Sequence, residues 1–294
     1  MPLWLLFTLV TMLLWGGWGV LSKPLSSALS PWQVQSLSCL GVLPVLAFLA
    51  RSPNLRSGSN PRKGFVIACG SGVLGSLGNV AYYESLAAGG KAAAVTPITA
   101  LYPLVTIGLA MLFLRERLNR VQALGVGLSV VALYLFNVGG DTAWLSPWLA
   151  VALIPIVLWG ASALLQKTAT GSASTELVAV GFIAGQLPVA LLTPLFQTVD
   201  LHLPGKTWLM LISLGLFFGF GNFTCILAYG KGGPAAVVTP LASLYSVITI
   251  PLAVWFLGER VVLRECLAIA LTLVAVIALG FETPMDKTVR KTVS

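Results

Sequence analysis

The chain has 294 residues, of which 57% are hydrophobic and only 9% are Asp, Glu, Lys or Arg. A water-soluble domain carries about 25% charged residues, so this composition excludes a soluble enzyme, a nucleic-acid-binding domain and a disordered chain. The net charge of +8 comes mostly from Lys and Arg in short breaks between apolar runs, which is typical of the cytoplasmic loops of membrane proteins.

Ten apolar segments in succession are long enough to cross a bilayer as helices. They comprise residues 3–21, 32–50, 65–87, 93–114, 120–137, 145–166, 177–197, 208–229, 235–257 and 262–281. Residues 3–21 are expected to stay as a membrane helix, because no basic residue precedes them and no small-residue cleavage site follows. Lipid offers no hydrogen bonds to the backbone. We therefore predict an all-α integral membrane protein with ten transmembrane helices.

The distribution of Lys and Arg predicts the orientation of these helices. An even number of spans places both termini on one side of the membrane. With the termini inside, twelve Lys and Arg fall in inner segments and five in outer ones. The positive-inside rule therefore predicts that both termini are cytoplasmic.

The two halves of the chain repeat each other. Residues 78–117 align without gaps on residues 221–260, with 19 identities in 40 positions. The identities include residue types that are rare in apolar segments, among them Asn79 with Asn222 and Pro97 with Pro240. Apolar composition alone would not align these residues, so the chain is predicted to contain an internal duplication.

The duplication predicts the domain organisation. Each copy holds five predicted helices, so the second copy enters the membrane in the opposite sense to the first. We predict one five-helix repeat at residues 1–140, an inverted repeat at 141–284 and a short basic cytoplasmic tail at 285–294. Inverted repeats are typical of transporters that alternate access around a central site.

Several repeated residues resemble the EamA family of the drug/metabolite transporter (DMT) superfamily, over essentially the whole chain in two copies. The matching residues are Trp15, Gly16 and Lys23 with Trp159, Gly160 and Lys167, then Pro97 with Pro240, and Glu116-Arg117 with Glu259-Arg260. The resemblance implies ten helices, cytoplasmic termini and a central cavity lined mainly by helices 1, 3, 4, 6, 8 and 9. It also implies the plasma (inner) membrane and secondary transport of small metabolites such as amino acids, commonly export.

Glu84 is the one acidic residue well inside a predicted span. An ionisable group at such depth usually faces protein or a water-filled cavity, so Glu84 is a candidate for proton coupling or for binding a cationic substrate. The alternative is a fixed ion pair with Lys91 or Lys23. Tyr82 and Tyr83 beside it belong to the candidate site, because the second copy has Cys and Ile at their positions.

The other candidate site residues occupy equivalent places in the two copies. They are Asn79 with Asn222, Thr96-Pro97 with Thr239-Pro240, Trp15 with Trp159 and Tyr102 with Tyr245. The amides are candidates for substrate binding or for a hydrogen bond that locks two helices together. Each proline frees the carbonyl four residues before it and favours a kinked helix and a gate. The aromatic rings are candidates for stacking on a flat or cationic substrate, or for packing alone.

No nucleotide-binding glycine loop or cluster of metal ligands occurs in the sequence, and the four Cys lie singly in apolar runs. We therefore expect no ATP-driven pump, no enzyme, no cofactor and no nucleic-acid partner. The expected partners are a small-molecule substrate, the lipid bilayer and a proton, while a homodimer is compatible with the sequence but not indicated. A sugar or nucleotide-sugar carrier and a non-transporting membrane scaffold remain alternatives.

Overall fold

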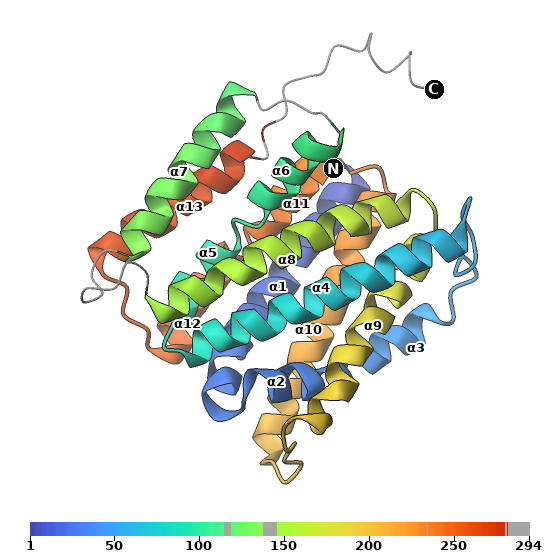
Figure 1. The fold of residues 1–294 in the computed structure, drawn as a ribbon, viewed down its shortest axis with the longest axis horizontal. Helices are drawn as coiled ribbons and strands as arrows, with labels where there is room; N and C mark the ends of the chain where they lie inside the picture. The colour runs from blue at the N-terminus through green and yellow to red at the C-terminus, as the bar shows by residue number, and fades with distance from the viewer. Residues whose placement is uncertain (115–118, 138–145, 234, 280, 282–294) are drawn as a thin grey trace.

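The computed structural model describes residues 1–114, 119–137, 146–233, 235–279 and 281. All regular secondary structure in this part of the chain is helical (Figure 1). The helices of the first half are α1 (Leu3–Ala28), α2 (Pro31–Ser38), η1 (Cys39–Val42), α3 (Leu43–Leu49), α4 (Pro61–Ala87), α5 (Ala92–Thr99), α6 (Pro103–Leu114) and α7 (Arg120–Asn137).

The second half follows a similar order, with one long helix and a terminal η2 where the first half has α2, η1 and α3. Its helices are α8 (Pro147–Thr170), α9 (Thr175–Leu192), η2 (Thr193–Leu195), α10 (Gly205–Gly230), α11 (Ala235–Ser243), α12 (Ser246–Leu257) and α13 (Leu263–Leu279). Eight helical segments of the described chain are long and apolar enough to span a membrane. The remaining two predicted spans correspond to α7 and α13, of 18 and 17 residues. The count of ten spans therefore stays a prediction.

Two predicted spans are broken rather than merely kinked. Helix α5 ends at Thr99 and α6 begins at Pro103, and a similar break separates α11 from α12. The prediction placed a kink at Pro97 and Pro240, but the breaks come several residues later, at Tyr102 and Tyr245. There the backbone closes in three-residue turns, in which Tyr102 N donates to the Thr99 carbonyl and Tyr245 N donates to the Ala242 carbonyl. Each break thus carries a tyrosine.

The long helices pack in two equivalent pairs. Helix α4 lies beside α8, as Figure 1 shows, and α1 packs against α10. The same bond recurs between the two halves: Thr106 Oγ1 donates to the Gly160 carbonyl at 3.0 Å, and Thr249 Oγ1 donates to the Gly16 carbonyl at 3.1 Å. Each half therefore inserts its first helix between elements of the other, and the central core belongs to both repeats.

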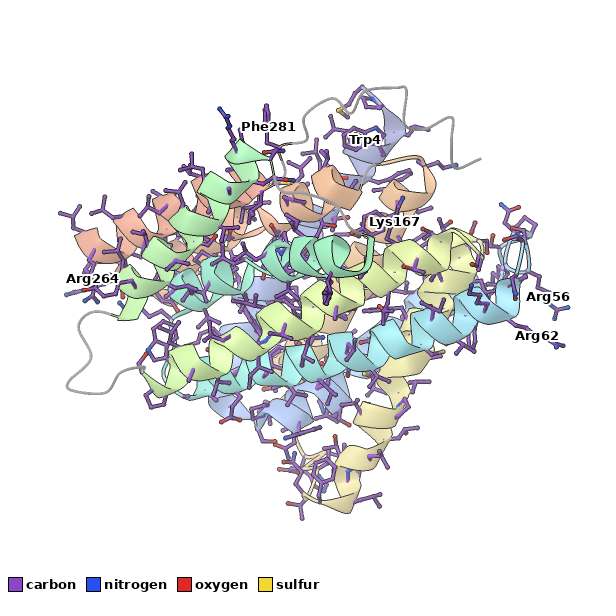
Figure 2. The ribbon with its side chains drawn as sticks, turned by 45° about the horizontal axis from the view of Figure 1, so that its top comes forward. Trp4, Arg56, Arg62, Lys167, Arg264 and Phe281 are labelled. Atoms are coloured by element: carbon purple, nitrogen blue, oxygen red, sulfur yellow. The ribbon has the colours of Figure 1, made fainter. Side chains whose placement is uncertain are left out.

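The two ends of the helix bundle can be distinguished by contacts. On the side where the chain begins, which we call the terminal side, Trp4 of α1 lies against Gly233, just after α10. On the opposite side, which we call the distal side, Trp148 of α8 lies against Gly90, just after α4. Figure 2 shows Arg56 at one end of the bundle and Arg264 at the other, with predominantly apolar helices between them. This charge distribution fits a body that spans a bilayer.

Candidate functional site

A central cavity lies where the two repeats meet, and most of its lining residues come from α8 and α10. The cavity has a volume of about 50 Å³, which is enough for only a few water molecules. The lining residues are Trp15, Trp18, Gly75, Tyr102, Trp159, Ser162, Ala163, Gln166, Phe182, Phe218, Asn222, Cys225, Tyr229 and Tyr245. The cavity extends toward the terminal side, because Gln166 and Tyr229 lie within about one turn of the ends of α8 and α10.

A cluster of aromatic rings closes the cavity on the distal side. Trp18 stacks on Tyr82 with ring centroids 4.7 Å apart, and it also contacts Tyr83 and Phe218 at 5.9 Å and 5.8 Å. Its Nε1 donates to the Tyr83 hydroxyl at 3.1 Å. Trp18, Tyr82 and Tyr83 are all buried. We call Trp18, Tyr82, Tyr83 and Phe218 the aromatic plug.

Three of the four plug residues align with small residues in the other copy. In the repeat alignment, Trp18 corresponds to Ser162, Tyr82 to Cys225 and Phe218 to Gly75. Those three small residues line the cavity. The large residues Trp18, Tyr82 and Phe218 therefore fill the distal side of the cavity. The small residues Ser162, Cys225 and Gly75 leave the cavity open at the equivalent positions. The asymmetry between the repeats thus decides which side of this conformation is closed.

The repeated threonines hold buried tyrosines in place. The hydroxyls of Tyr82 and Thr96 are 2.9 Å apart, and those of Tyr229 and Thr239 are also 2.9 Å apart. The same bond is thus made in both copies, although Tyr229 stands one helical turn beyond the position equivalent to Tyr82. Among the predicted site residues, Thr96, Pro97, Thr239 and Pro240 are buried behind the cavity wall rather than in its lining.

The repeated tryptophans line the cavity and differ in hydrogen bonding. Trp159 Nε1 donates to the Gly75 carbonyl at 3.3 Å. Trp15 Nε1 is buried and lacks a partner in the described chain. The indoles lie directly against Gly221 and Gly78, where even a methyl group would overlap them. Of the predicted aromatic pairs, Trp15, Trp159, Tyr102 and Tyr245 all reach the cavity.

The two predicted asparagines are placed differently. Asn222 lines the cavity, and its Nδ2 donates to the Phe218 carbonyl of its own helix at 2.9 Å. Asn79 is buried away from the cavity, and its Oδ1 has no partner among the described residues. Neither amide forms an interhelical hydrogen bond within that part of the chain, so the structure does not support the helix-lock alternative.

The alternative role of Glu84, an ion pair with Lys23 or Lys91, is not seen, because both lysines have other partners. Glu84 is exposed near the distal end of α4 and does not line the cavity. Lys23 instead donates to the carbonyls of Leu86 and Gly90, both at 2.8 Å, and so binds the end of α4. Lys91 pairs with Glu265 at 2.8 Å. The end of a helix carries partial negative charge and free carbonyls, and these carbonyls accept the hydrogen bonds of Lys23.

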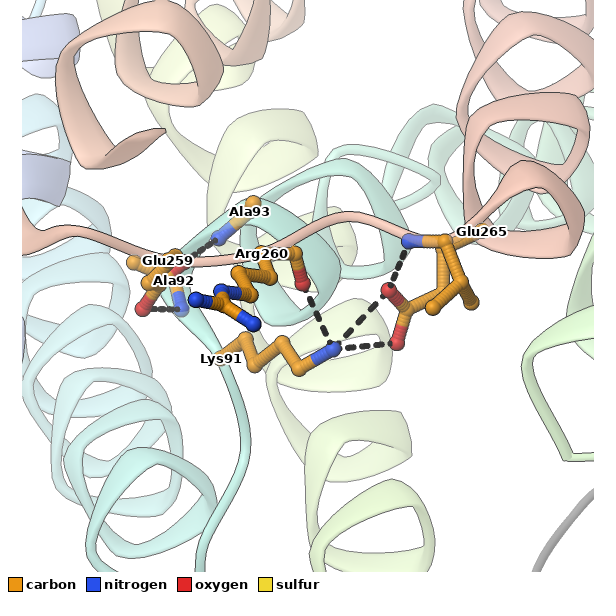
Figure 3. Close-up of polar contacts among 7 residues, drawn as sticks. Lys91, Ala92, Ala93, Glu259, Arg260 and Glu265 are labelled. Atoms are coloured by element: carbon orange, nitrogen blue, oxygen red, sulfur yellow. Dashed lines mark hydrogen bonds and ion pairs between the residues drawn. The ribbon is translucent and has the colours of Figure 1, made fainter. Parts of the chain in front are cut away.

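A second set of polar contacts fastens the distal side (Figure 3). Both carboxylate oxygens of Glu259 accept hydrogen bonds, from the backbone N–H groups of Ala92 and Ala93, each at 2.8 Å. Lys91 also donates to the Arg260 carbonyl at 2.9 Å. Glu259 therefore caps the start of α5. We call Glu259, Lys91 and Glu265 the distal latch; Glu116-Arg117, the equivalent pair in the first repeat, lies outside the described residues.

Removing the charge of Glu259 should weaken the distal latch. The Glu259→Gln variant loses a charge-assisted cap at the start of α5, and we expect a decrease of about 1–2 kcal/mol in the free energy of unfolding. Urea or thermal unfolding in detergent measures this change. Glu84→Gln is the matched control, since it removes an exposed carboxylate near the same side. An equal effect of both variants would contradict the assignment of a cap to Glu259.

Nine of the fourteen lining residues were not predicted from the sequence, and the five largest of these are Trp18, Gln166, Phe182, Phe218 and Tyr229. All five lack an identical residue in the other copy, so the repeat gives no signal at these positions. Helical spacing offered a signal for Trp18, because it follows Trp15 by three residues and therefore lies on nearly the same helix face. For the other four, only tertiary packing shows that they reach the cavity.

Comparison with known proteins identifies the family. The profile of the EamA-like transporter family matches residues 2–138 and 146–281. The chain belongs to the EamA-like transporter family. As an EamA-like protein with eight apolar helical segments it is an integral membrane protein. The two profile matches follow the two halves of the chain and so agree with the duplication seen in the sequence.

A solved crystal structure of a protein has the same EamA-like fold. It superposes with a TM-score of 0.66 at 20% identity, covering 93% of this chain and 94% of the other. An uncharacterised protein of Methanocaldococcus jannaschii is 34% identical over 68 residues, which are 23% of this chain. The aligned part spans about half the length of that curated relative, at 49%. The structural likeness supports the fold, and neither likeness identifies a substrate.

Proposed function

We propose that the protein is a secondary transporter that moves a small organic metabolite, such as an amino acid or a related solute, by alternating access. The observation that carries this proposal is a central cavity shared by both repeats and closed on the distal side by the aromatic plug and distal latch. A single-sided cavity between inverted repeats is what alternating access requires. The full arrangement would be ten helices in two inverted five-helix repeats.

The repeat symmetry suggests what the other conformation would be. Here Lys23 binds the carbonyls of Leu86 and Gly90 at the closed side. The equivalent closed arrangement on the terminal side would place Lys167 against the carbonyls of Tyr229 and Gly233. In the present conformation Lys167 instead lies 5.8 Å from the centre of the Tyr229 ring. Exchange between these two lysine arrangements would open one side as the other closes.

The finer assignments rest on charge counts and on the family. We propose cytoplasmic termini, the plasma membrane and export, in which case the cavity described here is reached from the cytoplasm. Proton coupling through Glu84 remains a prediction, to be tested with Glu84→Gln in transport assays at several pH values. A sugar or nucleotide-sugar carrier is a second candidate, because Asn222 and Gln166 present amides to the cavity.

Alternating access is testable with a cysteine that is already present. Cys225 lines the cavity, while Cys39, Cys69 and Cys266 do not and can be replaced by Ser. In oriented membrane vesicles, a membrane-impermeant thiol reagent should label Cys225 from the terminal side. The vesicles are then loaded with pools of amino acids, nucleosides or sugars, and counterflow of each pool is measured without ATP. A non-transporting scaffold would show neither labelling of Cys225 nor counterflow of any pool.

A further inference from the structure

The terminal half of the cavity contains hydrogen-bond donors that lack acceptors. Trp15 Nε1 is buried against Gly221 and has no partner among the described residues. The amide of Gln166 lines the cavity, is 6% exposed and forms no hydrogen bond with any described residue. Unpaired donors in a buried site are costly. They favour a ligand that brings acceptor atoms.

Lys167 does not line the cavity in this conformation, but it adds a positive charge beside the lining residue Tyr229. It follows Gln166 directly, near the end of α8 (Figure 2), and its ammonium lies 5.8 Å from the centre of the cavity-lining Tyr229 ring. No acceptor atom of the described chain binds this ammonium. The described acidic residue nearest to it in sequence, Glu176, accepts hydrogen bonds from Ser52 and Thr175 instead.

The equivalent lysine of the first repeat shows what Lys167 lacks. Lys23 occupies the same position relative to its Trp-Gly pair, and two backbone carbonyls accept its hydrogen bonds at 2.8 Å. Lys23 is therefore structurally satisfied, whereas Lys167 has only the face of an aromatic ring. A half-buried ammonium with this environment attracts an anion.

The remainder of the cavity is aromatic. Five further rings line it, from Trp15, Trp159, Phe182, Phe218 and Tyr245. No acidic residue of the described chain belongs to the lining. Seven residues separate Asn222 in the deeper part from Tyr229 near the terminal side, which corresponds to about 10 Å along α10. This length suits a flat ring joined to a charged group by a short linker.

We infer that the cavity binds an aromatic carboxylate, with the ring among the tryptophans and the carboxylate held by Lys167 and Gln166. The inference rests on the proposed transport function and names the substrate class of the same site. It makes Lys167 a determinant of specificity for anions. The cavity must widen to admit such a solute, since its present free space holds only a few water molecules.

Protection of Cys225 from a thiol reagent tests this inference. The probes are 3-phenylpropanoate, its neutral amide and the cationic 3-phenylpropylamine, which share a ring and differ in charge, at pH 7.5. We expect the carboxylate to protect at a concentration about tenfold or more below the amine. Lys167→Gln should weaken protection by the carboxylate about tenfold to a hundredfold, as for loss of a charged hydrogen bond, and leave the amide unchanged.

Two variants control for charge and for folding. Lys231→Gln removes an exposed lysine on the same side and should behave as the wild type. Lys167→Arg keeps the charge and should retain the preference for the carboxylate. Equal protection by all three probes, or an unchanged carboxylate affinity in Lys167→Gln, would overturn the inference. Reagent access to Cys225 without protection by any probe would also overturn it while leaving transport intact, whereas no access from either side would count against the transport proposal itself.

Discussion

Replacing Trp18 with Ala should open the distal side of the cavity. The variant loses ring contacts with Tyr82, Tyr83, Trp159 and Phe218, at centroid distances of 4.7, 5.9, 5.9 and 5.8 Å. Each aromatic pair contributes about 0.5–1.5 kcal/mol. Their combined loss, together with the bond to the Tyr83 hydroxyl, should shift the conformational equilibrium about 30-fold or more.

Thiol labelling from each side measures that shift. Ser22→Cys provides a distal reporter, because Ser22 is buried here and corresponds in the repeat to the cavity residue Gln166. In Trp18→Ala the distal reporter should become reactive from the distal side, and Cys225 should become less reactive from the terminal side. Trp32→Ala, which removes a ring that contacts Phe196 outside the cavity, should change neither rate. An unreactive distal reporter in Trp18→Ala would show that the plug does not close this side.

The second large effect is expected at Gly221, against which the Trp15 indole packs. A Cβ at this position would overlap Trp15 Cδ1 and Nε1. Alanine favours a helix over glycine by about 1 kcal/mol, but overpacking costs about 1–3 kcal/mol and moves a ring that lines the cavity. We therefore expect Gly221→Ala to lower the melting temperature and to impair transport.

Gly127 in α7 supplies the matched control for this prediction. No atom lies within 4 Å of a Cβ placed there, so Gly127→Ala should gain helix stability without overlap. Thermal unfolding in detergent and counterflow in vesicles compare the two variants. If Gly221→Ala were as stable and active as Gly127→Ala, close packing of the Trp15 indole on α10 would be required neither for stability nor for transport.

Charge and hydropathy allowed much of the architecture to be predicted from local sequence. The helical class and the membrane location follow from 9% charged residues and long apolar runs. The repeat was visible because Asn79, Pro97 and their counterparts are rare in such runs. The repeated aromatic residues Trp15, Trp159, Tyr102 and Tyr245 all line the cavity. Their roles in substrate binding remain predictions.

Partner choice was not predictable from local sequence. Lys23 and Glu84 are both charged and were expected near the same membrane side, so an ion pair was a reasonable alternative. The structure instead gives Lys23 two carbonyls at the end of α4 and leaves Glu84 exposed. Glu259 likewise binds N–H groups that precede it by more than 160 residues. Such partners are set by how helices from different repeats come together.

The sequence by itself determined that the chain is an all-helical membrane protein with two related halves, because lipid imposes long apolar helices and duplication leaves identities. Only the tertiary structure decided which residues face the cavity and which side is closed. Ring stacking by Trp18, Tyr82 and Phe218 fills one side, whereas Ser162, Cys225 and Gly75 leave space on the other. The physical reason is that closure depends on contacts between helices distant in sequence, where small differences between near-identical repeats have their effect.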